Sequence, residues 1–116
     1  MVLDVCVISK PGGSTYSHVT FIIKAADGYY EFGFYGEGKT NESASTVTID
    51  RYDALPAHRK LYSQGQTSRS LQELIDKANT WRGRPYNLVT QNCSDHCKML
   101  CVFAGVPYPA GAALDR

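Results

Sequence analysis

The chain has 116 residues, of which 43% are hydrophobic and 20% charged, a composition that indicates one globular domain over residues 1–116 and argues against disorder. Its 12 lysines and arginines nearly balance 11 aspartates and glutamates, so neither nucleic acid nor an anionic membrane is expected as a partner. No apolar run is long enough to span a bilayer, and the start MVLDVCVISK has an acid, Asp4, where a signal peptide would carry basic residues. We therefore expect a protein of the cytoplasm, or one exported by a dedicated secretion system.

The first third of the sequence predicts β-strands. Residues 2–9 form a short valine-rich run that ends at the loop sequence KPGGS. Residues 18–38 predict a β-hairpin whose two-residue turn is Asp27-Gly28, because this dipeptide tolerates the positive φ values of a type I′ turn. The resulting register would place His18 opposite Glu37.

Alternation along this hairpin predicts two different faces. The face expected to be buried holds Val19, Phe21, Ile23, Phe32 and Phe34. The partly polar face holds His18, Thr20, Lys24, Glu31, Tyr35 and Glu37.

The rest of the chain predicts one more strand and two helices. Residues 46–50 alternate like a strand, whereas residues 51–67 indicate an irregular connection or a short helix. A helix should begin after Ser70, which forms a capping box with Glu73. The last helix should cover residues 94–104, capped by Asn92 or Cys93, and the tail after it should be loosely ordered.

Three of the four cysteines, Cys93, Cys97 and Cys101, recur every four residues, so one helix face would hold them and disulfides within the helix are not expected. A zinc site built from Cys93, His96 and Cys97 would lack the second ligand pair of structural sites, so no metal is expected. Cys97, Cys101 and Cys6 are interpreted as packing residues.

Cys93 is the candidate nucleophile, because a helix N-terminus stabilises a thiolate. A thiol also needs a base, and three histidines are available. His18 opens a strand beside a glycine-rich loop and could be oriented by Glu37. His96 could approach the thiol but would reach over a bound carbonyl with difficulty, and His58 is interpreted as a surface residue.

The segment YNLVTQNCSDHCKMLCVFAGVP, together with SHVTFII and YYEFGFYGEG before it, resembles the circularly permuted papain-like (NlpC-type) cysteine hydrolases, including PPPDE peptidases and bacterial effector amidases. The resemblance implies an α+β fold in which an antiparallel sheet packs against a helix with the cysteine at its N-terminus. It also implies Cys93 as nucleophile and His18 as base. The hairpin alternation puts His18 on the polar face, so a bulge or one-residue shift would be needed to turn it toward the cysteine.

The chemistry expected from this resemblance is cleavage of an amide bond without metal or organic cofactor. The oxyanion would be held by the Cys93 amide and by Gln91 or Asn92. The expected partner is a peptide or peptidoglycan-type substrate, together with a protein inhibitor or immunity partner if the domain acts as an effector. Two alternatives stay open: a PPPDE-like isopeptidase acting on protein conjugates, and a non-catalytic interaction module with the same fold.

Overall fold

The computed structural model describes residues 2–11, 17–36 and 42–114. These ranges contain two α-helices, a short 3-10 helix and seven strands. In chain order the elements are β1 Leu3–Lys10, β2 His18–Ala25, β3 Gly28–Gly36, β4 Glu42–Ser43, β5 Ser45–Tyr52, β6 Lys60–Thr67, α1 Leu71–Asn79, β7 Tyr86–Asn87, α2 Cys93–Ala104 and the 3-10 helix η1 Ala110–Leu114.

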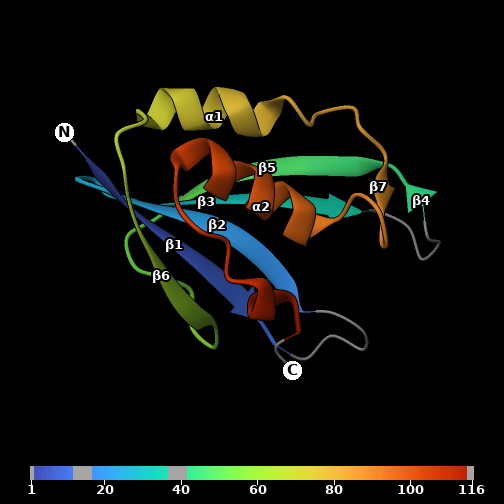
Figure 1. The fold of residues 1–116 in the computed structure, drawn as a ribbon, viewed down its shortest axis with the longest axis horizontal. Coiled ribbons are helices and arrows are strands. Elements are labelled where there is room, and N and C mark those ends of the chain that lie inside the picture. The colour runs from blue at the N-terminus through green and yellow to red at the C-terminus, as the bar shows by residue number, and fades with distance from the viewer. Residues whose placement is uncertain (1, 12–16, 37–41, 115–116) are drawn as a thin grey trace.

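Five strands form one antiparallel sheet in the order β5-β3-β2-β1-β6, and the two short strands β4 and β7 pair beside it (Figure 1). Helix α2 packs against β2 and β3, and α1 packs against α2 and β5. The expected α+β class is confirmed, as is an antiparallel sheet packed against the helix that begins with Cys93. None of the helices in the described ranges is long and apolar enough to cross a membrane.

The core lies between the sheet and the two helices. All five hairpin residues predicted for the buried face are fully buried there, and the helices contribute Leu74, Cys97, Leu100 and Cys101. The interpretation of Cys97 and Cys101 as packing residues is therefore confirmed. Cys6 lies in β1 on the opposite side of the sheet from its buried neighbours Val5 and Val7 and is half-buried.

The hairpin is confirmed, but its predicted register is wrong, because each residue of β2 pairs with a residue two positions earlier in β3 than predicted. Ala26 and Asp27 form the turn, Lys24 pairs with Tyr29, and Phe21 pairs with Phe32. Gly28 instead opens β3 with φ of +138°, and Asp27 is held by a hydrogen bond from the Arg51 guanidinium to its carbonyl. Because the faces depend on alternation alone, they remain as predicted.

Residues 60–67, expected within an irregular or helical segment, form strand β6 on the edge of the sheet next to β1. The prediction failed because only Thr67 of this strand is buried, so the apolar alternation of a strand is weak. The ladder also contains a bulge opposite Val5 and Cys6, where Gly65 has φ of +123°.

Residues 53–59 connect β5 to β6, which lie at opposite edges of the sheet. Four strand spacings amount to about 19 Å, and a seven-residue segment reaches at most about 25 Å, so the connection crosses the sheet nearly extended. We call it the crossing segment. Leu55 and Arg59 from this segment line cavities with residues of the sheet face away from the helices, which we call the second face.

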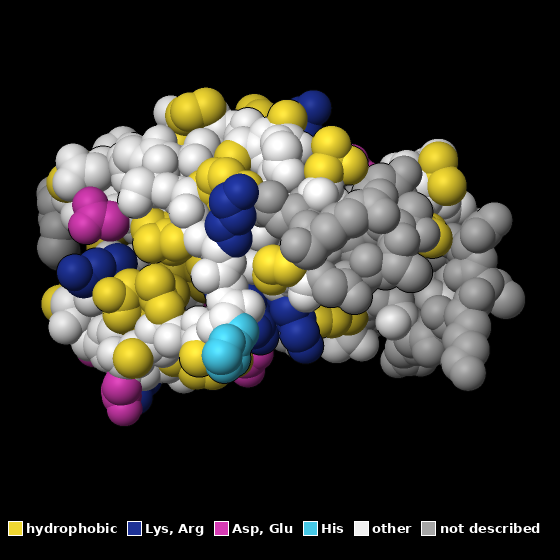
Figure 2. Space-filling model, turned by 90° about the horizontal axis from the view of Figure 1, so that it is seen from below, with side chains coloured by type: hydrophobic (Ala, Val, Ile, Leu, Met, Phe, Trp, Pro, Cys, Tyr) yellow, Lys and Arg dark blue, Asp and Glu magenta, His cyan; other side chains and the backbone are white. Residues whose placement is uncertain are grey.

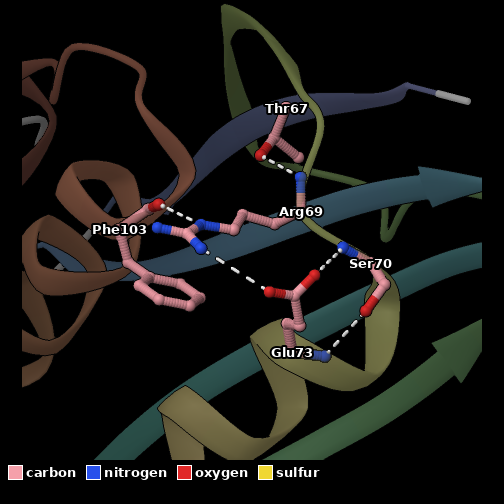
Figure 3. Close-up of polar contacts among 5 residues, drawn as sticks. All are labelled: Thr67, Arg69, Ser70, Glu73 and Phe103. Carbon is pink, nitrogen blue, oxygen red and sulfur yellow. Dashed lines mark hydrogen bonds and ion pairs between the residues drawn. The ribbon is translucent and has the colours of Figure 1, made fainter.

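Helix α1 begins as predicted, with Ser70 and Glu73 forming a reciprocal capping box. Arg69, just before the cap, links α1 to the end of α2 (Figure 3). Its Nε donates a hydrogen bond to the Phe103 carbonyl at 3.1 Å, and its guanidinium lies over the Phe103 ring. The same guanidinium forms an ion pair with Glu73 in the first turn of α1. The tail is more ordered than expected, because residues 110–114 form η1 and pack against β1 and β2.

Candidate functional site

Cys93 is the first residue of α2, and its side chain is 7% exposed. Asn92 is the N-cap: its side chain accepts a hydrogen bond from the Asp95 amide, and Asp95 accepts one from the Asn92 amide in return. The preceding turn is fixed by two backbone hydrogen bonds between Asn87 and Gln91, at 2.8 and 3.0 Å. These hydrogen bonds therefore hold the start of α2, and with it Cys93, in a fixed position.

The Cys93 thiol is surrounded by hydrogen-bond donors: the backbone amides of Val19, Ser94 and Cys93 itself, and the hydroxyl of Tyr86. Burial raises the pKa of the thiol, and these donors act in the opposite direction because they favour the thiolate. Burial and the neighbouring Cys93 raise the pKa of Tyr86 to about 12, so its hydroxyl keeps its proton at neutral pH.

A cavity of about 170 Å³ lies beside the thiol. Ser17 and Ala113 form one wall, and the Ser17 amide donates to the Ala113 carbonyl at 3.0 Å, so the C-terminal tail shapes the cavity. Leu88 and Val89, 38% and 72% exposed, form its apolar rim. The cavity therefore has room for a small apolar group next to the Cys93 sulfur.

The two side chains predicted for the oxyanion site are otherwise engaged. Gln91 donates its side-chain amide to the Pro85 carbonyl and its backbone amide to the Asn87 carbonyl. Asn92 donates its side-chain amide to the Leu88 carbonyl at 2.9 Å. These residues shape the turn, and the donors that act on the thiol are instead the amides of Val19, Cys93 and Ser94 and the Tyr86 hydroxyl.

His18 is not brought to Cys93. Its neighbour Val19 points into the core beneath α2, so His18 points to the second face, as strand alternation requires. There its ring lies against Tyr35, with centroids 4.3 Å apart. Burial, with Lys10 and Arg59 nearby, lowers the pKa of His18 to about 4.

Glu37, predicted to orient His18, lies outside the described residues. In the described part of the ladder the register differs from the one that led to Glu37, and the His18 ring lies against Tyr35. The reason is the turn, which uses Ala26 and Asp27.

The other two histidines also lie away from the thiol. The His96 ring is buried between Phe34 and Trp81, and its Nε2 contacts the Ala78 carbonyl at 3.2 Å. His58 is exposed in the crossing segment, with φ of 60°. Within the described residues, no group of three or more His, Cys, Asp or Glu side chains is arranged to hold a metal ion.

Two contributors to the site were missed from the sequence: the Tyr86 hydroxyl and the Val19 amide. Tyr86 belongs to the aromatic-Asn-Leu segment that carries the family resemblance, so its position was a usable signal. The Val19 amide had no signal, since only the tertiary structure brings β2 to the start of α2.

No family model, curated protein or solved structure matches this chain.

Proposed function

We propose that the protein is a cysteine hydrolase of the circularly permuted papain-like type that cleaves an amide bond through Cys93. The observation that supports this most is the thiol at the start of α2, which receives amide and hydroxyl donors beside an open cavity. The amides stabilise a thiolate there, and a nucleophile requires that form.

In this mechanism the thiolate attacks the carbonyl carbon, and the Cys93 amide and the Tyr86 hydroxyl hold the oxyanion. The high pKa of Tyr86 suits this role, because a protonated phenol donates a hydrogen bond at neutral pH. The C–N bond then breaks and the amine leaves with a proton, which gives a thioester. Water attacks the thioester, the acyl group leaves as a carboxylic acid, and the thiol is regenerated.

The thiol has a raised pKa, so it needs a base to lose its proton. The observed fold keeps the His18 ring on the second face, so His18 is not this base, and solvent in the Cys93 cavity is the proposed proton acceptor. His18→Ala should then leave turnover unchanged. A loss of about two to four orders of magnitude, the usual contribution of an acid-base group, would instead return His18 to the mechanism.

The proposed substrate is a peptidoglycan stem peptide, with a protein conjugate as the alternative. The cavity volume of about 170 Å³ and the rim of Leu88 and Val89 favour a small, uncharged group beside the scissile bond. Digestion of purified sacculi, run beside a panel of ubiquitin-like conjugates, distinguishes the two substrates.

The decisive comparison is Cys93→Ser against Cys97→Ser and Cys101→Ser, two buried cysteines of the same helix. Hydrolysis should be lost in the first variant and kept in the other two. Tyr86→Phe should lower turnover by about 10²- to 10³-fold, the usual effect of removing an oxyanion donor. Unchanged hydrolysis by Cys93→Ser would refute the proposal.

A second candidate is a non-catalytic interaction module with this fold. It is favoured by the raised pKa of Cys93 and by the absence of a histidine among the described residues that line its cavity. Alkylation by iodoacetamide across a pH series separates the two, in a Cys6→Ser background because Cys6 is half-buried and would also react. A catalytic thiol should be alkylated at neutral pH in spite of its raised pKa, and faster than the buried Cys97 and Cys101, whereas a packed thiol should react only in alkali.

A further inference from the structure

The second face contains a polar cavity of about 320 Å³, separated from Cys93 by the thickness of the sheet. Strands β1, β2, β3 and β5 form its floor, and the crossing segment contributes Arg59. Its lining residues are Ile8, Lys10, His18, Thr20, Glu31, Tyr35, Tyr52 and Arg59. Unlike the Cys93 cavity, it combines several charged side chains in a small volume.

The His18 ring is the first sign that this cavity accepts a ligand. Its Nε2 atom is buried and has no hydrogen-bond partner in the protein. A buried polar nitrogen without a partner is unfavourable, and a ligand atom at this position would remove that penalty. The low pKa of His18 keeps the ring neutral, so Nε2 can donate a hydrogen bond in one tautomer.

Two cations lie near the His18 ring. Lys10 pairs with His18 across the β1-β2 ladder, and both Lys10 and Arg59 act on the His18 ring electrostatically. The Arg59 guanidinium donates one hydrogen bond to the Ala57 carbonyl, at 2.9 Å. Its other N–H groups can donate to a ligand. Figure 2 shows basic side chains on the face seen from below. An anionic group is the natural counterpart of this arrangement.

Whereas the cations favour an anionic group, Glu31 favours a hydrogen-bond donor in the same cavity. Its carboxylate is 8% exposed and accepts hydrogen bonds from Thr20, at 2.7 Å, and from Tyr52. An ionised carboxylate has about four acceptor positions, so it can take a further donor. It also disfavours a doubly charged anion such as phosphate.

We propose that this cavity binds a small hydroxy or amino carboxylate: the ligand carboxylate lies between Lys10 and Arg59 and accepts from His18 Nε2, while its hydroxyl or ammonium donates to Glu31. The cavity volume suits a ligand of this size. The site is independent of Cys93, since the two cavities lie on opposite faces of the sheet.

The test is a titration of the 116-residue chain with glycolate, glycine, acetate and inorganic phosphate, observed by NMR at the His18 ring protons. His18→Gln identifies the resonance by its disappearance. Glycolate and glycine should shift it saturably, and acetate, which lacks the donor, and phosphate should bind more weakly. Lys10→Gln and Arg59→Gln should each weaken glycolate binding by about tenfold or more, the value of a charge-assisted hydrogen bond.

Lys24→Gln is the matched control, because Lys24 is an exposed lysine at the other end of β2 and should leave binding unchanged. Glu31→Gln should abolish the preference for glycolate over acetate while it keeps an acceptor for Thr20. The proposal is overturned if glycolate at about 10 mM leaves the His18 resonance unmoved. Tightest binding by phosphate, or equal binding by parent and Arg59→Gln, would also overturn it. None of these variants touches Cys93, so failure of the hydrolase proposal would not affect this result.

Discussion

Acid should unfold this protein through His96, a buried neutral histidine. Its side chain is 1% exposed and lies between the Phe34 and Trp81 rings, with centroids 5.4 and 5.3 Å away. Burial lowers its pKa from 6.5 to about 4, although the Ala78 carbonyl favours the charged form. Below pH 6.5 the unfolded chain therefore binds a proton that the folded protein does not, so stability falls as the pH falls.

The size of this effect follows from the two pKa values of His96, 6.5 when unfolded and about 4 when folded. At about 1.4 kcal/mol per pH unit, His96 alone should cost about 2 kcal/mol at pH 5 and about 3 kcal/mol at pH 4. His18, whose pKa is also lowered to about 4, should contribute a similar loss. Together the two histidines should remove a large part of the free energy of unfolding, which is about 5–15 kcal/mol for an ordinary domain.

His96→Phe isolates the contribution of one ring. Phenylalanine keeps the aromatic packing and cannot be protonated, and the Ala78 carbonyl still accepts from the Trp81 amide at 3.3 Å. Between pH 7 and pH 5 the variant should lose about 2 kcal/mol less than the parent, as measured by urea unfolding at each pH. His58→Gln, a change at an exposed histidine, is the control. An equal loss in His96→Phe and parent would refute the reasoning.

Three further variants test the packing and the local geometry by urea unfolding at pH 7. Leu100→Ala should cost about 2–5 kcal/mol, because Leu100 is fully buried between the helices and the sheet; a loss below about 1 kcal/mol would contradict that position. Ser70→Ala should cost about 1 kcal/mol through loss of the capping box, and an unchanged midpoint would mean that the cap is not needed. Gly28→Ala should destabilise by more than about 1 kcal/mol, since φ is +138° and a new Cβ would lie 2.6 Å from the Tyr52 carbonyl oxygen. Gly111→Ala, where a Cβ meets no atom within 4 Å, should be nearly neutral by comparison.

The two helices could be predicted because their signals are local. The capping box of Ser70 and Glu73 and the residues around Asn92 and Gly105 fix the helix ends within a few positions of sequence. The buried face of the hairpin was predictable for a similar reason, since side chains alternate regardless of register.

The sequence by itself determined that this is one α+β domain and that Cys93 begins a helix, because composition, alternation and capping act over short stretches of chain. Only the tertiary structure decided that β6 completes the sheet, that Val19 and Tyr86 surround the thiol, and that His18 faces the other way. Strand pairing, turn choice and the path of the crossing segment depend on contacts between residues far apart in sequence. The sequence of a single strand does not indicate which strand it will pair with. Because side chains alternate between the two faces, a shift of one residue is enough to put a histidine on the opposite side of a sheet from the cysteine.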